Sequence, residues 1–464
     1  MKTAFFPWVC FAPTFALILS CGMGCAEVQA VDPGGTGGAG GSGGTVGNDC
    51  TADAECGTAT PICGVEGSCR GCVSATECSS KDMSFPICAD DGRCVECFDN
   101  NDCNEPNSPV CDETSLACRG CDLHSECDSE VCDIGTGACV GEASVVYASP
   151  TGGGSTCNRA FPCSFLPDAV NLAGGAKPYL RLLPGQYTQR LTLANKEVTV
   201  VGEGATLNLT ALGGTEPGVL ITGTVDVAID GLTVTNLSTG SGLVCDTSGR
   251  ITVHRSSFER HDGDGINCSN LTMTESNVSD NGGLGIVTFS GGAVIERSTI
   301  ARNFGGGISG GGLIRNNLII GNSNLSNYQG AIRVSGESNT TITYNTIVGN
   351  FVNENFIGIV GCAADTIVSS NIIFDNEFPG TEDQTLISCS DTRNNLSDAD
   401  IRSTGTGNIV GDPMFTDAAA GDYSLMQGSP AIDGGEVAVA PDVDFNGDMR
   451  PIGAGSDIGA IESN

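Results

Sequence analysis

The stretch ITYNTIVGN, residues 342–350, is preceded by IRNNLIIGN at 314–322 and followed by VSSNIIFDN at 368–376. The last residue of each such stretch serves as a marker, and the markers along the chain are Asn236, His261, Asn281, Asn303, Asn322, Asn350 and Asn376. They are 25, 20, 22, 19, 28 and 26 residues apart. Periods of this length are typical of solenoids, so we predict an all-β fold, a right-handed parallel β-helix of about nine coils.

Three columns support this register. Apolar side chains recur eight residues before the markers, at Ala228, Val253, Met273, Ile295, Ile314, Ile342 and Val368. They recur again three residues before, at Thr233, Phe258, Val278, Ile300, Ile319, Ile347 and Ile373. Small hydrogen-bonding residues stand five before, at Gly231, Ser256, Ser276, Ser298, Asn317, Asn345 and Asn371. Asn and Ser fit tight turns and can bond to the same position one coil away, so we expect a buried polar ladder.

Charge and glycine content narrow the class of protein. The chain carries 55 acidic against 20 basic residues, a formal net charge of -35. This charge repels nucleic acid and anionic membrane surfaces, so we expect no nucleic-acid partner. Residues 22–48 include PGGTGGAGGSGGTVG, which has too few side chains to pack and reads as a flexible linker.

The first 21 residues, ending in LILSC, read as a secretion signal. The LILSC ending resembles a bacterial lipobox, which implies lipidation of Cys21 and attachment to a membrane through the lipid alone. An ordinary signal peptide cut near Ala26 or Ala30 is the alternative, and Cys25 is a second candidate for the lipid. Either reading predicts a location outside the cytoplasm, on the outer membrane or cell surface, or else secreted.

Residues 49–141 form a cysteine-rich repeat. Sixteen cysteines fall into four units of four, each starting C-x5-C, with C-x2-C joints between units. Disulfides and zinc thiolates share such spacing. Export, the even number of cysteines in each unit and the scarcity of histidine favour two disulfides per unit, with the connectivity open. The region resembles the cysteine-rich spacers of bacterial surface lipoproteins.

Residues 142–464 form the main domain, and both of its ends carry recognisable motifs. Its start, with PGQY at 184–187, resembles the start of pectin-lyase-like proteins, which implies a capping helix over about 166–173 and a loop pinned by Cys157 and Cys163. The motifs DPMF, GSPAID and DIGAIE near the end resemble β-helix proteins with a choice-of-anchor Q type C-terminal region. Within the helix, the register places Cys245 beside Cys268 and Cys362 beside Cys389, within disulfide reach of neighbouring strands.

Chemistry could reside in HRSSFERHDGDG, residues 254–265. The candidate catalytic residues are Arg255, Arg260, His261, Asp262 and Asp264, which would suit proton abstraction beside a uronate carboxylate. The alternative is structural: charges alternate in sign from coil to coil at Asp230, Arg255, Glu275 and Arg297, and at Arg260, Asp280 and Arg302. Such pairs form ion-pair ladders on the surface of a sheet, and we favour this reading, so we assign no catalytic residue.

A calcium loop is a further candidate. Asp442, Asp444, Asn446 and Asp448 alternate oxygen ligands around Gly447, but the usual Glu six residues after the glycine is missing. A plain C-terminal turn is the favoured interpretation, so no cofactor is expected, with calcium kept as the exception.

The sequence thus predicts an exported, lipid-anchored surface protein with a binding or structural role. The expected partner is an extracellular polysaccharide or another cell-surface polymer, contacted along one face of the β-helix. The alternative is a polysaccharide lyase or related carbohydrate-active enzyme working near residues 255–264. In an enzyme, His261, an arginine and the acids should converge in one groove. In a binding protein they should be splayed.

Overall fold

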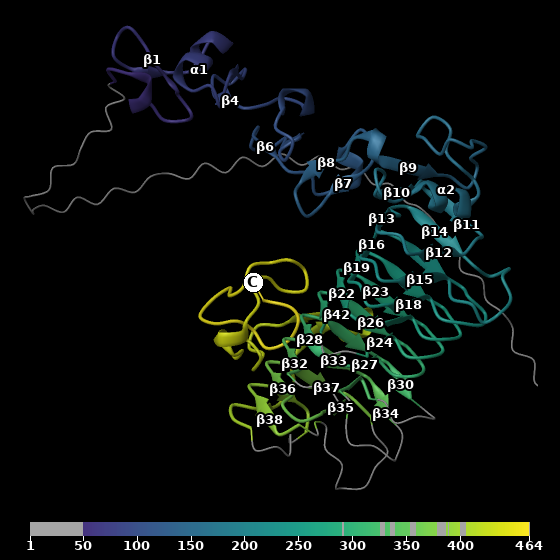
Figure 1. The fold of residues 1–464 in the computed structure, drawn as a ribbon. Coiled ribbons are helices and arrows are strands. Elements are labelled where there is room, and N and C mark those ends of the chain that lie inside the picture. The colour runs from purple at the N-terminus through teal and green to yellow at the C-terminus, as the bar shows by residue number, and fades with distance from the viewer. Residues whose placement is uncertain are drawn as a thin grey trace, which may run out of the picture.

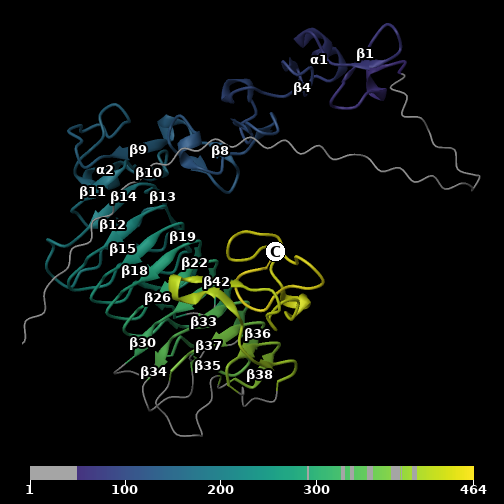
Figure 2. The ribbon, with the colours of Figure 1, turned by 180° about the vertical axis from the view of Figure 1, so that it is seen from behind.

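The computed structural model describes residues 50–289, 292–324, 330–334, 339–352, 359–377, 387, 389–399 and 405–463. The predicted signal, lipobox and linker therefore lie outside the described residues. A string of small disulfide-bonded units leads into a long stack of β-coils, and the C-terminal region folds back against the side of that stack (Figures 1 and 2).

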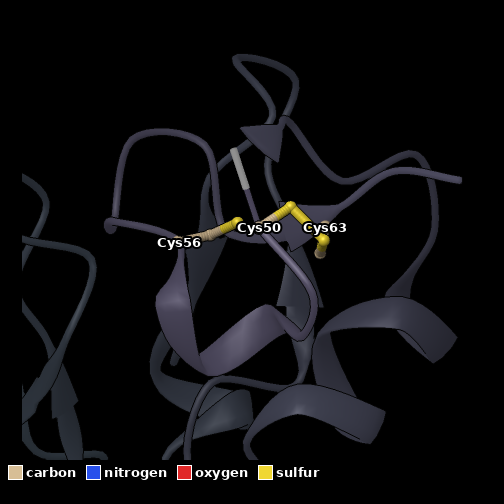
Figure 3. A group of neighbouring side chains, drawn as sticks. All are labelled: Cys50, Cys56 and Cys63. Atoms are coloured by element: carbon tan, nitrogen blue, oxygen red, sulfur yellow. A yellow bond between two sulfur atoms is a disulfide. The ribbon is translucent and has the colours of Figure 1, made fainter. Parts of the chain in front are cut away.

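Each cysteine-rich unit contains one short antiparallel hairpin and two disulfides. The first cysteine of a unit bonds to the third, as in Cys50–Cys63 (Figure 3), and the second to the fourth, as in Cys56–Cys69. The same order holds in the other three units, so the predicted disulfides are confirmed and their connectivity is now defined. The elements are β1 (Ile62–Cys63) with β2 (Cys69–Arg70), α1 (Ala75–Lys81), β3 (Ile87–Cys88) with β4 (Cys94–Val95), β5 (Val110–Cys111) with β6 (Cys118–Arg119), and β7 (Cys132–Asp133) with β8 (Ala138–Cys139).

The main domain is a parallel β-helix with three sheets. The first sheet contains β9 (Val145–Ala148), β10 (Tyr179–Leu182), β13 (Val198–Val201), β16 (Val227–Asp230), β19 (Ile251–His254), β22 (Leu271–Thr274), β25 (Ala293–Glu296), β28 (Gly312–Arg315), β32 (Thr341–Thr343), β36 (Ile367–Ser369) and β38 (Asp391–Arg393). The second contains β11 (Gly185–Tyr187), β14 (Ala205–Asn208), β17 (Thr233–Thr235), β20 (Ser257–Glu259), β23 (Asn277–Ser279), β26 (Thr299–Ala301), β29 (Leu318–Ile320), β33 (Thr346–Val348), β37 (Ile372–Phe374), β39 (Leu396–Ser397) and β40 (Ile409–Val410). The third contains β12 (Leu191–Ala194), β15 (Val219–Gly223), β18 (Leu243–Thr247), β21 (Ile266–Cys268), β24 (Ile286–Val287), β27 (Ile308–Ser309), β31 (Ile332–Arg333) and β35 (Val360–Gly361).

Eight coils of the described chain contribute a strand to all three sheets, and shorter coils follow them. A two-stranded parallel pair, β30 (Ser323–Asn324) with β34 (Phe351–Val352), extends two of the coils. The interior is one continuous apolar core in which like residues stack from coil to coil, such as Val253, Met273, Ile295 and Ile314. The predicted capping helix is α2 (Leu166–Leu172), which buries Leu166, Ala169 and Val170 at the first end of this core.

The predicted polar ladder runs along the turn between the first and second sheets. Asn345 is fully buried, and its Oδ1 accepts hydrogen bonds from the backbone N–H and Nδ2 of Asn317, both at 3.0 Å. Its Nδ2 donates to Oδ1 of Asn371 at 2.9 Å and to the carbonyl of Ile314 at 2.9 Å. A second ladder runs through Asn322 and Asn350 in the same manner. Each amide therefore satisfies buried backbone groups of its neighbours.

The predicted register is wrong by one residue in its first coil. Strand β16 pairs Ile229, not Ala228, with Val253, and β17 pairs Val234, not Thr233, with Phe258. The ladder positions in this coil are accordingly Leu232 and Leu237, in place of Gly231 and Asn236. Both leucines are buried, so each polar ladder ends at this coil in an apolar side chain. Their backbone N–H groups still donate to Ser256 and His261 of the next coil.

The predicted disulfides of the main domain are present. Cys157 bonds to Cys163 in the loop before α2. Cys245 and Cys268 are directly paired residues of β18 and β21, and they form a second bridge. Cys362 bonds to Cys389 near the last coils.

The C-terminal region covers the last part of the second sheet. There the outward side chains are apolar, among them Leu318, Ile320, Val348 and Phe374. They pack against Phe415, Tyr423 and Ala460 of the region that contains the hairpin of β41 (Phe415–Asp417) and β42 (Asp422–Leu425). The buried Arg450, whose guanidinium lies 4.8 Å from the ring centre of Tyr344 and 3.0 Å from Glu462, ties the DIGAIE motif to the coils.

The fourth cysteine-rich unit is docked onto the start of the β-helix. Val131 packs with Val145, Tyr147 and Val201, and the Tyr147 hydroxyl donates to the carbonyl of Ser129 at 2.9 Å. Among the described helices, none is long and apolar enough to cross a membrane.

Candidate functional site

The outer face of the second sheet changes character half-way along the stack. Its early strands expose Thr233, Ser257, Asn277 and Thr299 at one outward position, each half-buried, and we call these four residues the polar strip. The next coil has Leu318 at this position, and there the C-terminal region begins to cover the sheet. The polar strip is not covered in this way.

Hydrogen bonds hold the strip in place. Asn277 Nδ2 donates to the Ser257 hydroxyl at 3.0 Å and to the Ser279 hydroxyl at 2.9 Å. Ser279 is buried, so the groups that face a ligand here are the amide oxygen of Asn277 and the hydroxyl of the half-buried Ser257. A row of hydroxyl and amide groups with a regular spacing of about 4.8 Å from coil to coil suits an extended hydroxyl-rich chain.

Ion pairs line both edges of the strip. On one edge, Arg255 contacts Asp230 at 3.2 Å, and Arg297 pairs with Glu275 of the preceding coil. On the other edge, Arg302 makes two 2.7 Å contacts with Asp280. Hydrogen bonds from Arg302 hold the pKa of Asp280 below its usual range. The predicted alternation of charge is therefore present from Arg255 to Arg297 and from Arg260 to Arg302, whereas Asp230 lies opposite His254 and contacts Arg255 from outside its column.

The backbone explains why these charges project outward. Arg255, Glu275 and Arg297 have φ values of 44°, 51° and 46°. Arg260, Asp280 and Arg302 have φ values of 59°, 58° and 53°. One left-handed residue at each corner turns the chain sharply and directs its side chain away from the core. The turns thus build two outward columns of charge beside the strip.

A cavity of about 480 Å³ lies at the Arg255 edge. The strip residues Ser257, Asn277 and Thr299 contribute to its lining, and Phe445 and Asn446 of the C-terminal loop form another part of its wall. Its volume lies within the range of about 300 to 1,000 Å³ typical of ligand sites. An aromatic ring beside amides, hydroxyls and arginines can hold a sugar by stacking and hydrogen bonding.

The five candidate catalytic residues do not converge. Arg255 lies at the corner between the first and second sheets, whereas Arg260, His261, Asp262 and Asp264 follow the second-sheet strand β20 at its opposite end. Arg260 pairs with Glu259, and Asp264 accepts a hydrogen bond from the backbone N–H of Leu284 at 2.8 Å. Asp262 is exposed. The splayed arrangement is the one expected for a structural ladder.

His261 is a member of the second ladder and is 2% exposed. Its backbone N–H donates to Oδ1 of Asn281 at 3.0 Å, and its Nε2 lies 3.1 Å from the carbonyl of Val234. Burial lowers the pKa of His261 to about 4, so the ring is neutral at ordinary pH. The histidine performs the role of asparagine in other coils, which the marker alignment itself indicated.

The candidate calcium loop forms a tight turn beside the cavity. Asp444 is fully buried, and its Oδ1 accepts hydrogen bonds from the backbone N–H groups of Asn446 and Asp448 at 2.8 and 2.9 Å. Its Oδ2 accepts from Glu462 N at 2.9 Å. Asp442 and Asp448 are exposed. Turn formation accounts for Asp444, and calcium binding by the four residues remains a prediction.

The sequence analysis missed the polar strip and the cavity wall formed by Phe445 and Asn446. A signal for part of the strip was present: polar residues stand four before His261, Asn281 and Asn303, and Leu318 stands four before Asn322. The wall had no local signal, because Phe445 is 188 residues from Ser257 along the chain.

Comparisons with known proteins agree with this architecture. Residues 198–317 and 269–412 match a family described as right handed beta helix region. Residues 37–145 match a family of unknown function, DUF8331. No curated protein is a significant match to the chain. The main domain is thus a right-handed parallel β-helix, preceded by a disulfide-rich region.

Among solved structures, the pectate lyase Pel9A shares 16% identity with this chain. The alignment covers 70% of this chain and 100% of the Pel9A chain, with a TM-score of 0.44. XylC with xylose shares 10%, covers 60% of this chain and 66% of its own, and has a TM-score of 0.33. The A-module of the Azotobacter vinelandii mannuronan C-5 epimerase AlgE6 shares 12%, covers 53% and 93%, and has a TM-score of 0.25. None of these likenesses indicates a substrate or an activity for this chain.

Proposed function

We propose that the chain is an exported, lipid-anchored surface protein that binds an extracellular polysaccharide or related polymer along the polar strip. The observation that carries this proposal is the contrast within one sheet face. Where the outward residues are mostly apolar, the C-terminal region packs directly on them, and beside the hydroxyls and amides of the strip it forms only one wall of a cavity. A face that is polar, regular and flanked by balanced charges suits a long hydroxyl-rich ligand.

The polysaccharide lyase alternative has less support. Proton abstraction needs a base, and a group that stabilises the resulting charge, within reach of one substrate carbon. Here the buried His261 is engaged in a ladder and lies at the other corner from Arg255. Arg255 itself contacts Asp230.

The test is binding of the purified full chain to a panel of neutral and uronate polysaccharides by affinity electrophoresis. Asn277→Trp should block the strip and abolish retardation of the chain by the bound polymer. The matched control is Thr192→Trp on the exposed outer face of the third sheet, which should bind as the parent does. If no polymer retards the chain, or if both variants bind equally, the strip is not the binding site.

The same panel decides between binding and lysis. Incubation with each uronate polymer, with and without calcium, should give no increase in ultraviolet absorbance, because no unsaturated sugar is formed. If unsaturated product forms with the parent chain and not with Asn277→Trp, the strip is the site of a polysaccharide lyase and the proposed binding role is wrong.

Lipid anchoring has its own test. Cys21→Ser should move the chain from the membrane fraction to the soluble fraction, because the thiol that would carry the lipid is gone. Continued membrane attachment of this variant would point to Cys25 or to another anchor.

A further inference from the structure

A second hollow lies on the outer face of the first sheet, next to the cysteine-rich units. It consists of two adjoining cavities of about 370 and 400 Å³. Both are lined by Tyr179, Thr199, Ala228 and Thr252, so they form one depression, which we call the junction trough. Each part alone is within the size range of small-molecule sites.

The floor of the trough is a single stacked column. Tyr179 pairs with Thr199, Ala228 follows in β16, and Thr252 follows in β19. All four side chains point outward and are half-buried. The floor thus offers an aromatic ring at one end and small hydroxyl side chains further along, without a charged group.

Two different parts of the chain form the walls. One wall is the hairpin β7–β8 of the fourth cysteine-rich unit, where Asp133, Ile134 and Gly135 face the floor. The opposite wall is formed at the turns that lead into the first sheet, where Glu197, Asp226 and Arg250 line the trough. The smaller of the two cavities therefore depends on the docking of the fourth unit onto the β-helix, whereas the larger is lined by the β-helix domain alone.

The docking holds the hairpin wall firmly. Arg181, which is buried, lies 3.3 Å from Glu130 of the fourth unit, and Arg159 lies 3.1 Å from the same carboxylate. Arg255 donates to the carbonyl of Asp122 at 3.1 Å. A preformed wall lowers the entropic cost of binding a ligand.

The end of the trough near β19 contains a buried histidine ring, that of His124. The His124 ring lines the cavity and is 2% exposed, and its Nδ1 accepts a hydrogen bond from the backbone N–H of Cys132 at 3.0 Å. Nε2 therefore carries the proton of the neutral ring. It lies 3.3 Å from Asp230 Oδ2, so the buried histidine holds the wall of the trough together and is not itself a free ligand group.

Charge limits the ligand that the trough can take. Asp133, Glu197, Asp226 and Asp230 line it against Arg250 alone, so the walls repel an anionic ligand. Two of these acids are already engaged, Asp226 by the backbone N–H of Arg250 and Asp230 by Arg255, which leaves no strong cation site. A neutral ligand with many hydroxyl groups fits both the floor and the walls.

We propose that the junction trough binds a short neutral oligosaccharide, with a sugar ring against Tyr179 and hydroxyl groups bonded to Thr199 and Thr252. This site is on a different sheet from the polar strip, so it does not depend on the proposed polymer binding. It assigns the fourth cysteine-rich unit a direct part in ligand binding, beyond that of a spacer.

The test is calorimetric titration of the full, oxidised chain with cellohexaose, xylohexaose, mannohexaose and maltohexaose, and with hexagalacturonate and hexalysine as charged comparators. We expect one of the four neutral hexaoses to bind more tightly than either charged probe. Ala228→Trp, which fills the floor, should weaken that binding at least tenfold. Thr252→Val should weaken it several-fold, because a hydroxyl is removed with little change in shape.

Thr192→Trp on the third sheet is the matched control and should titrate as the parent does. Thermal melting of each variant shows whether the fold is kept, and Thr252→Val remains informative if Ala228→Trp fails to fold. Binding of no neutral hexaose, tighter binding of hexagalacturonate or hexalysine that a folded Ala228→Trp weakens, or an unchanged titration of Thr252→Val and a folded Ala228→Trp would overturn the proposal. Since Ala228→Trp should still bind polymer at the polar strip, failure of either site can be recognised separately.

Discussion

The cysteine-rich units and the coils of the β-helix are both short repeats, but different interactions hold them. A cysteine-rich unit buries mainly its own disulfides and a few side chains such as Ile62 and Val110, and its strands are two residues long. A coil buries stacked apolar columns and fully paired amide ladders shared with both neighbours. The first kind of repeat is stable because each unit is cross-linked, and the second because it has neighbours.

The largest effect should follow from cutting one covalent unit. Replacing Cys103 and Cys118 by serine removes a bridge that closes a separation of 15 residues, and a loop of that size contributes about 3 kcal/mol. Because this unit has little other core, we expect it to unfold while the β-helix stays intact. Limited proteolysis with mass spectrometry should show new cleavage confined to about residues 97–120.

The matched change in the β-helix is replacement of Cys245 and Cys268 by serine. Their strands are also paired by backbone hydrogen bonds within the third sheet, so this variant should keep its coils and only melt earlier. Cleavage within the coils of this variant, or none in the cysteine-rich variant, would contradict the contrast.

The next effect concerns the ladder. Asn345→Leu leaves Asn317, Asn371 and the carbonyl of Ile314 without a buried partner, and each unpaired group costs about 1 to 3 kcal/mol. We expect a fall of at least about 3 kcal/mol in the free energy of unfolding, measured by urea titration. Asn350→Ser should cost less, because a serine hydroxyl can still accept from the backbone of Asn322. Equal losses for the two variants would show that the amide ladder is not what stabilises the coils.

The last effect is absent at neutral pH, appears only as the pH falls and concerns His261. Its pKa is about 4 in the folded chain against about 6.5 when exposed, so both forms are neutral above pH 6.5 and stability is unaffected there. As the pH falls from about 6.5 to 4, the unfolded chain gains a proton that the folded chain cannot hold, and stability decreases by up to about 3 kcal/mol.

His261→Asn should remove this component, since asparagine is the ladder residue of the other coils. Urea midpoints at pH 7 and pH 4.5 for parent and variant provide the measurement. An identical loss between the two pH values in parent and variant would mean that His261 does not titrate as a buried group.

The sequence by itself determined the repeat, and through it most of the fold. A coil must match the coil on either side of it, so stacking constraints appear in the sequence as columns, and these predicted the β-helix, the Asn345 ladder and the Cys245–Cys268 bridge. The same logic failed at Asn236, because Leu232 and Leu237 end the ladders with apolar side chains and the column no longer has a polar signature. Disulfide connectivity in the cysteine-rich units was open as well, since spacing alone allows several pairings.

Only the tertiary structure decided where ligands can lie. The polar strip is open because direct packing of the C-terminal region begins at Leu318, and its cavity depends on Phe445, which is far away in sequence. The smaller cavity of the junction trough depends on the docking of His124 and Ile134 over the first sheet. Such sites arise between segments that have no periodic relation to each other, and their geometry is set by packing of the folded chain and leaves no regular pattern in the sequence.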